Sequence, residues 1–336
     1  MRQVLISFLI LGANINIYAQ GCCSGGAGGP IAGGAASGVL QEYQMEISIN
    51  HQFNTSKTFY TGSEVAEPLF DNLTSNYIFF RTDYGVSKKL TLSLASGYYL
   101  SKKKEAEYIT SNRTSSGFSD LIIFPRYNVY NKNANFKRTE VALGIGIKIP
   151  LGTHMDSTLY YSDEWLGDLY SINPPLVQTT NGSNDFMFYS FIFREYQKRK
   201  LRLFISALHV KKSFNSLGLK FGDYSSLGLF VSKTFFRQWG VTTQLKLEHI
   251  GKIKAAENID LLADYNIEPI STGSNKAFFT PQISYSQKGL TFFVTSEIPI
   301  YQYLHGTQIG SQNQFTFGVN YRFLTKKPET EFELKK

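Results

Sequence analysis

The sequence predicts an all-β fold: a single antiparallel transmembrane β-barrel of about twelve strands. Three observations support this prediction. Segments of about ten to fourteen residues alternate apolar and polar side chains, as strands with two unlike faces do. The connections between them are alternately short and long, and no stretch of about 18 apolar residues follows the N-terminal segment. The composition is 18% charged and 15% aromatic, whereas soluble proteins carry about 25% charged residues.

The alternation is clearest between residues 138 and 150. One face carries apolar side chains, and the other carries Glu140, Lys148 and small residues. Segments 90–100 and 315–323 repeat the pattern, whereas residues 186–193 are apolar on both faces. A tilted crossing of the bilayer needs strands of about 9–11 residues, longer than those of soluble sandwiches. The expected strands lie near 39–54, 75–86, 89–100, 118–130, 138–150, 184–197, 200–213, 223–235, 239–252, 277–287, 290–300 and 313–325.

The connections support the same strand count. Every second joint is short and carries Lys or Arg, as at 87–89 and 286–289. The alternate joints are longer, and the longest, residues 151–184, carries acidic side chains instead. Outer-membrane barrels have short periplasmic turns and longer extracellular loops. We therefore expect the short basic turns in the periplasm and the 151–184 loop outside the cell.

The two ends of the chain differ from the alternating region between them. Residues 1–19 form a predicted signal peptide, in which Arg2 precedes an apolar run and Ala19 marks the cleavage point. Residues 20–38 are rich in Gly and Ala and predict a flexible leader. Residues 39–325 form the expected barrel, and residues 326–336 form a charged periplasmic tail. The exported barrel is expected in the bacterial outer membrane.

Cys22 and Cys23 are the only cysteines and are adjacent, so the sequence holds no disulfide framework. Three roles stay open for them. They are an ordinary part of the leader, or one is acylated after cleavage, or the two thiolates capture a soft metal such as Cu(I). None of the five histidines has a metal-binding spacing. We expect no cofactor, and the two cysteines are the only metal candidates.

If the apolar faces contact lipid, the polar faces line the lumen. Charged side chains in a narrow barrel either pair across strands and fill space, or select the solute. Small inward side chains at positions such as Ala142, Gly144, Gly146, Thr316 and Gly318 are expected to leave space, which predicts a narrow or gated passage. The charged side chains, or the leader folding inward, are expected to close it. The lumen-facing candidates are Arg81, Asp83, Arg126, Glu140, Lys148, Lys246, Glu248, Glu297 and Arg322.

Three short motifs carry a resemblance to a known family. The stretch Gly117-Phe118-Ser119-Asp120-Leu121-Ile122-Ile123 with Arg126-Tyr127, and the stretch Ile147-Lys148-Ile149-Pro150-Leu151-Gly152-Thr153, match a Gly-x-x-Asp strand start and a strand that ends in a Pro-x-Gly loop. Ile298-Pro299-Ile300-Tyr301 with Gly306-Thr307-Gln308 is similar to a penultimate strand and loop. The chain thus resembles the outer-membrane transporter family named for the meta-pathway of phenol degradation. The resemblance implies a channel-like barrel related to transporters of hydrophobic compounds.

Two other segments also resemble known patterns. The final expected strand, Gln314–Phe323, resembles the C-terminal signal strand through which outer-membrane proteins meet the barrel-assembly machinery. The Gly-Cys-Cys-Ser-Gly-Gly leader resembles exported proteins of Bacteroidetes-type bacteria. The expected partners are therefore outer-membrane lipids, a small solute and that machinery. The net charge of +8 does not imply nucleic acid, because an exported protein rarely meets it.

These features predict an outer-membrane channel or transporter for a small solute, which the resemblance extends to hydrophobic compounds. We expect no enzyme activity, since the sequence holds no Gly-x-Ser-x-Gly motif. Two alternatives stay open. A lipid-acting enzyme of phospholipase type would need Ser and His on adjacent strands at the membrane boundary. His209 and His249 lie in expected strands, and Ser206 and Ser232 are near them in register. A structural or adhesive barrel would use its long loops to bind partners.

Overall fold

The computed structural model describes residues 38–105, 112–165, 167–262 and 267–326. The predicted signal peptide, most of the leader with Cys22 and Cys23, and nearly all of the C-terminal tail lie outside these ranges. The fold is all-β, and twelve long strands form the wall of one barrel, which confirms the predicted class and strand number. These strands are β1 Gln44–Ser56, β4 Asn72–Gly85, β5 Leu90–Glu105, β7 Asp120–Ala134, β8 Lys137–Pro150, β11 Asp185–Tyr196, β12 Leu201–Lys211, β14 Tyr224–Phe235, β15 Trp239–Ile250, β17 Ser274–Gln287, β18 Leu290–Ile309 and β19 Gln314–Leu324.

Antiparallel pairing of the first and last strands closes the barrel. Each strand pairs with its neighbours in the chain, and β1 pairs with β19 from Gln44 opposite Leu324 to Phe53 opposite Phe315. The closed ring leaves no free sheet edge, which a membrane-embedded sheet cannot tolerate. Among the described residues, no helix combines the length and apolar character needed to cross a membrane.

Apart from bulges in β5, β7 and β18, side chains alternate between the two faces of the wall. In β8, Ala142 is fully buried while Leu143 and Ile145 are 48% and 63% exposed. The exposed faces of the other strands carry similar apolar side chains, including Ile49, Leu94, Leu229 and Phe317. So broad an apolar surface is unfavourable in water, so this outer face is the one that contacts lipid.

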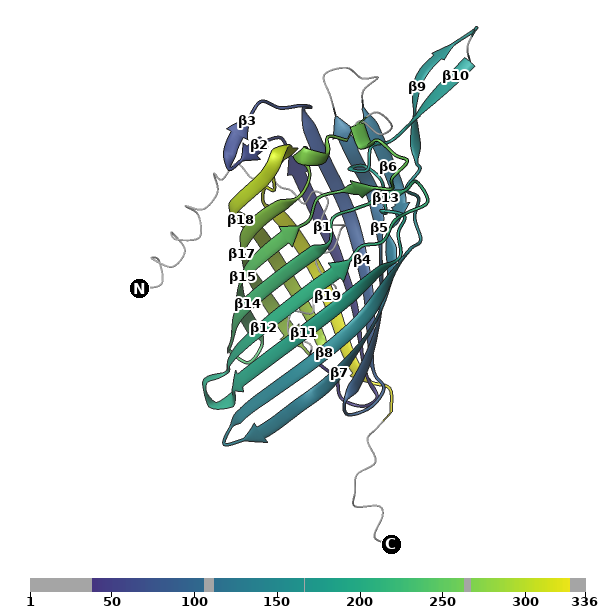
Figure 1. Cartoon of the computed structure of the whole chain (residues 1–336). Helices are drawn as coiled ribbons and strands as arrows, with labels where there is room; N and C mark the ends of the chain where they lie inside the picture. The colour runs from purple at the N-terminus through teal and green to yellow at the C-terminus, as the bar shows by residue number, and fades with distance from the viewer. Residues whose placement is uncertain (1–37, 106–111, 166, 263–266, 327–336) are drawn as a thin grey trace.

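The two ends of the barrel differ in the length of their connections (Figure 1). At one end, where β19 ends, lie the short turns. The turns at 135–136 and 288–289 have two residues each, with positive φ at all four positions, as type I′ hairpins require. The opposite end carries the long connections and the small elements β2 Phe59–Gly62, β3 Glu64–Ala66, β6 Arg113–Phe118, β9 Ser157–Asp163, β10 Gly167–Ile172, β13 Leu219–Lys220, β16 Lys254–Ala255, and the 3-10 turn Pro269–Ser271; a second 3-10 turn, Gln197–Arg199, lies at the short-turn end.

Several strand limits differ by a few residues from those expected from the sequence, and two of the differences change the lumen or the loops. The first strand was expected near residue 39 but begins at Gln44, and the residues before it turn into the lumen. The eleventh strand was expected to end near residue 300, but β18 continues to Ile309. Its extension pairs with β2, a contact between segments far apart in the chain. The last connection is therefore only 310–313 and is not a long loop.

Candidate functional site in the barrel lumen

A chain of ion pairs crosses the lumen wall at the short-turn end, and we name it the charged ladder. Glu46 of β1 accepts hydrogen bonds from Arg322 of β19, with Nε to Oε2 at 2.7 Å, and from Arg81 of β4 at 3.2 Å. Asp83 lies 2.8 Å from Arg81 Nε and 2.9 Å from Arg126 Nη2 of β7. All except Arg322, whose side chain is 45% exposed, are buried. Three arginines thus share two carboxylates across neighbouring strands.

A second ion-pair group involves β15 and β18. Lys246 of β15 lies 2.8 Å from Glu297 of β18 and 3.4 Å from Glu248. Glu248 also accepts a hydrogen bond from the Tyr224 hydroxyl at 3.2 Å. With Glu140 and Lys148, described below, each of the nine candidate residues forms at least one ion pair. Their charges are largely balanced within the protein.

Residues 38–40, the described end of the leader and the two residues after it, lie inside the barrel against Glu140, and we name them the inserted segment. Glu140 of β8 accepts the Val39 amide at 2.8 Å and a hydrogen bond from Arg138 at 2.6 Å. The Leu40 amide donates to Thr91 Oγ1 at 2.8 Å, and the Leu40 side chain is buried. These residues therefore lie inside the lumen near the short-turn end, directly before β1.

The middle of the lumen is lined by aromatic rings. On β11, Met187, Phe191 and Phe193 point inward and are buried. Phe191 and Phe193 are stacked with ring centroids 6.2 Å apart, and Phe204 and Phe230 on the next strands are stacked at 4.4 Å. They belong to one buried apolar cluster that extends from β4 to β14. The sequence signal was the run at 186–193 with two apolar faces, but by itself it could not place a cluster inside the barrel.

The glycines of the lumen do not leave open space, so that expectation was wrong. An added Cβ at Gly144 or Gly146 would lie 2.8 Å or 2.5 Å from the ring of Phe124. One at Gly318 would lie 2.0 Å from the ring of Phe293. Large rings on adjacent strands therefore cover the glycines, as in other sheets where an aromatic side chain packs over a glycine. The space that the small residues vacate is filled from within the wall.

The long-loop end instead contains a cavity of about 400 Å³, which we name the mouth cavity. Its wall side belongs to the same apolar cluster that fills the middle of the lumen. Its other side is formed by the long connections and the extended end of β18. Representative lining residues are Met187, Leu208 and Val210 from the wall, and Phe59, Leu176 and Ile309 from the loop side.

Two buried ion pairs lie beside this cavity. Lys148 Nζ lies 2.7 Å from Asp120 Oδ2, and Lys212 Nζ lies 2.7 Å from Asp185 Oδ2. Both lysines line the cavity. Burial and the neighbouring Lys148 ammonium lower the pKa of Lys212 below its usual range, while Asp185 opposes that shift. Each of these ammonium groups has a carboxylate of its own.

A third lysine of the cavity has a different partner. Lys276 of β17 is 5% exposed, and its ammonium donates to Ser311 Oγ at 2.9 Å. Ser311 is held in turn by Gln302, which accepts the Ser311 amide at 2.7 Å and donates to its carbonyl at 3.1 Å. Within the described part of the chain, no carboxylate lies within 4.0 Å of the Lys276 ammonium. Lys276 is not among the lumen residues predicted from the sequence.

Two of the motifs quoted from the sequence meet at this end of the barrel. Asp120 pairs in register with Pro150, and its carboxylate binds Lys148. An added Cβ at Gly152 would lie 1.8 Å from the carbonyl oxygen of Phe118, so only glycine fits there. The Gly-x-x-Asp and Pro-x-Gly patterns therefore form one structural unit, in which a buried ion pair and a close backbone contact fix the start of the longest loop.

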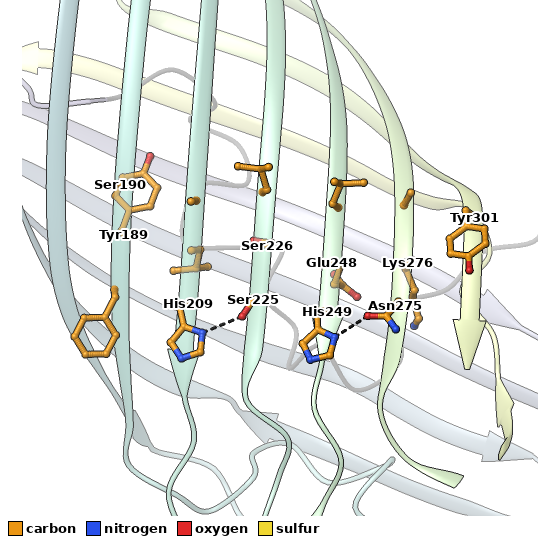
Figure 2. Close-up of a pocket in the computed structure, with 16 residues that line it drawn as sticks. Tyr189, Ser190, His209, Ser225, Ser226, Glu248, His249, Asn275, Lys276 and Tyr301 are labelled. Carbon is orange, nitrogen blue, oxygen red and sulfur yellow. Dashed lines mark hydrogen bonds between the residues drawn. The ribbon is translucent and has the colours of Figure 1, made fainter. Parts of the chain in front are cut away.

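A row of polar side chains crosses the outer face of the wall near the long-loop end (Figure 2). His209 Nδ1 and Ser225 Oγ are 2.9 Å apart, and His249 Nδ1 and Asn275 Oδ1 are 2.7 Å apart. The row borders a hollow of about 690 Å³, which Tyr301 also lines. The outer face here is thus locally polar.

The expected serine partners of these histidines were wrong. Ser206 and Ser232 are buried on the lumen side, and Ser232 accepts a hydrogen bond from Thr242. The histidines are exposed on the outside. Positions 206 and 209 differ by an odd number, so in a strand they face opposite sides of the wall. Ser225, directly across from His209, is the serine that the histidine meets.

No group of three or more His, Cys, Asp or Glu side chains in the described ranges could hold a metal ion. The only metal candidates from the sequence, Cys22 and Cys23, lie outside those ranges.

Comparison with known proteins establishes the fold alone. No family model and no curated protein matches the chain. Among solved structures, an outer-membrane channel from Pseudomonas putida F1 is 11% identical, covers 85% of this chain and 97% of its own, and has a TM-score of 0.61. The NanC porin is 11% identical over 82% of this chain and 98% of its own, with a TM-score of 0.43, and the KdgM porin is 10% identical over 83% and 99%, with a TM-score of 0.39.

The first likeness shows that the fold is that of an outer-membrane β-barrel. At this identity a likeness establishes architecture and no activity.

Proposed function

We propose that this protein is an outer-membrane channel that takes up a small hydrophobic solute through a narrow, gated lumen. The observation that carries the proposal is the mouth cavity, which is apolar and continues into the aromatic cluster within the barrel. Ligand pockets of this size, lined by apolar side chains with a few polar groups, hold small organic molecules. A channel for hydrophilic solutes would instead be expected to have a polar, water-filled interior.

The short-turn end supports a restricted passage. The charged ladder and the inserted segment occupy the lumen there, and both are held by buried hydrogen bonds. A solute that reaches this end must pass or displace them. The resemblance to transporters of hydrophobic compounds points in the same direction, and the joined Asp120 and Gly152 motifs are its structural counterpart.

The proposal includes an orientation, with the long loops outside the cell and the short turns in the periplasm. In a background in which Cys22 and Cys23 are replaced by serine, a cysteine at Ser162 should react with a membrane-impermeant thiol reagent on intact cells. A cysteine at Lys88 should react only after the cells are opened. Both side chains are exposed, so accessibility of the site itself does not limit the comparison. The opposite labelling pattern would rule out the orientation.

The transport step is tested by blocking the cavity. Val210→Trp adds a large ring at the cavity wall and should reduce uptake of a hydrophobic fluorescent dye by cells about tenfold. Leu247→Trp, on the lipid face and 48% exposed, is the matched control and should leave uptake unchanged. Liposomes containing the protein should swell slowly in small sugars. Rapid swelling in sugars, together with dye uptake equal to that of cells lacking the protein, would contradict the proposal and favour a hydrophilic pore.

A second candidate function, hydrolysis of a lipid ester, rests on one observation: the hydrogen bond between His209 and Ser225 on the outer face. In such a pair the imidazole would take the proton of the serine hydroxyl as it attacks the ester. The test is labelling with a fluorophosphonate that reacts with activated serines. Labelling that disappears in Ser225→Ala would support hydrolysis; equal signals in both proteins would remove it and leave the channel or an adhesive barrel.

A further inference from the structure

We propose that the mouth cavity binds an amphiphilic anion, with a single carboxylate that pairs with Lys276 and an apolar body that lies among the cavity walls. The proposal rests on the channel function above and adds the chemical class of the solute.

The lysines of the cavity do not all have a carboxylate partner among the described residues. Three lysines line it, and two of them, Lys148 and Lys212, are each paired with an aspartate at 2.7 Å. Lys276 is as buried as they are, but the acceptor that the structure gives it is the neutral hydroxyl of Ser311. The cavity therefore carries one ammonium charge without a carboxylate from the described residues.

The nearest acidic side chain is already engaged. Glu248 stands directly opposite Lys276 in the pairing of β15 with β17, and both are labelled in Figure 2. The Glu248 carboxylate instead binds Lys246 and the hydroxyl of Tyr224, and it lies more than 4.0 Å from the Lys276 ammonium. Among the described residues, Glu268 is the only acidic one that lines the cavity, and it is exposed. A bound anion would thus meet little competition for Lys276.

Burying the Lys276 ammonium has a free-energy cost. An ammonium group held away from water is unfavourable unless a counter-charge and hydrogen bonds compensate it. The Ser311 hydroxyl, fixed by Gln302, holds the ammonium in place but supplies no charge. A ligand carboxylate would supply it, and a charge-assisted hydrogen bond is about twice as strong as a neutral one.

The other lining residues of the cavity indicate the chemistry of the rest of the ligand. Away from the three lysines the lining is mainly apolar, with Phe59, Phe70, Leu176, Ile253 and Ile309 among its members. Such walls favour an alkyl chain or an aromatic ring over a second polar group. Carboxylates with an aromatic body and with a short alkyl chain share this chemistry, and the experiment separates them.

The test uses matched probes on the purified full-length barrel in detergent. Octanoate and 1-octanol share a chain length but differ in charge, and benzoate and benzyl alcohol form the aromatic pair. Wild type should bind at least one acid about tenfold more tightly than its alcohol at neutral pH, since about 1.4 kcal/mol corresponds to tenfold. The preferred pair identifies whether the body is alkyl or aromatic. Equal affinities for acid and alcohol in both pairs would overturn the proposal without any variant.

Variants then assign the effect to one side chain. Lys276→Met should abolish the preference for the acid while alcohol binding is retained, and Lys276→Arg should keep it. Lys211→Met is the matched control, because this exposed lysine near the same end pairs with Asp223 and does not line the cavity. A preference that survives Lys276→Met in a folded barrel would overturn the assignment. If neither acids nor alcohols bind to wild type, the proposed hydrophobic channel itself fails, which distinguishes the two claims.

Discussion

Charged side chains have different partners at the two ends of the lumen. At the short-turn end, charged side chains bind one another across strands, and Glu46 and Asp83 are shared by three arginines. At the long-loop end, apolar side chains surround a cavity in which Lys276 has a hydroxyl partner in place of a carboxylate. Charges paired within the wall make the first end a structural element. The cavity and its lysine make the second end the place where a solute can be recognised.

The largest effect is expected from breaking the charged ladder. Asp83→Asn keeps the shape of the side chain but removes the negative charge between Arg81 and Arg126, both of which are buried. Breaking a buried pair leaves an uncompensated charge, so the free energy of unfolding should fall by about 3–5 kcal/mol. Denaturant unfolding of the protein in lipid vesicles measures this value.

The matched control for the ladder is an exposed pair at the same end. Glu195 and Arg202 are 3.1 Å apart, with side chains 19% and 40% exposed. Glu195→Gln should cost about 0–1 kcal/mol, as surface pairs do. Equal losses in the two variants would mean that the ladder contributes no more to stability than a surface pair.

The next effect separates the lipid face from the lumen. Ile145 is 63% exposed on the outer face of β8. Ile145→Arg should destabilise the barrel by about 2–4 kcal/mol if this position lies near the bilayer midplane. Phe235→Arg, at the short-turn end of β14, should cost about 0–1 kcal/mol because charges are tolerated near the interface. The folded fraction after heating, measured on a gel, ranks the two variants, and the reverse order would place the membrane elsewhere.

A smaller effect is expected from the covered glycines between the two ends. A Cβ at Gly146 would lie 2.5 Å from the Phe124 ring and 2.9 Å from the carbonyl oxygen of Ile123. Gly146→Ala should therefore cost about 1–3 kcal/mol through overpacking. At Gly240 the contact is the hydroxyl of Ser284, which can rotate away, so Gly240→Ala should cost less. Thermal unfolding of the two variants compares them, and similar losses would show that Phe124 moves freely.

The sequence predicted the wall of the barrel well because strand periodicity is exact. Alternation at 138–150 assigns Ile145 to one face and Glu140 to the other without any knowledge of neighbours. Alternate connection lengths gave the strand number for a similar reason, since both signals are local. The end of β18 was missed because its extension exists only through pairing with β2.

The lumen was less predictable because its contacts join distant parts of the chain. Glu46 and Arg322 are 276 residues apart, and their contact depends on the register of the closing strands. Lys276 looked like any other strand lysine, since only the folded structure shows which lysines have acidic partners. The inward glycines predicted open space because the sequence does not reveal that Phe124 and Phe293 cover them.

The smallest expected effect on stability comes from weakening the contact between the inserted segment and Glu140. Glu140 accepts the Val39 amide and binds Arg138, whose side chain is 38% exposed. Glu140→Gln keeps an acceptor of the same shape but weakens the hydrogen bond to the Val39 amide, because an ionised acceptor binds more strongly. Stability should change by no more than about 1 kcal/mol, since the ion pair that is lost is partly exposed.

Conductance in planar bilayers should rise if the inserted segment restricts the passage. Arg138→Gln removes the same ion pair but leaves the Glu140 carboxylate for Val39, so its conductance should stay at the wild-type level. If both variants show the same increase in conductance, loss of the ion pair and not the weaker contact with the inserted segment explains the increase. Deletion of residues 22–37 should then leave conductance unchanged.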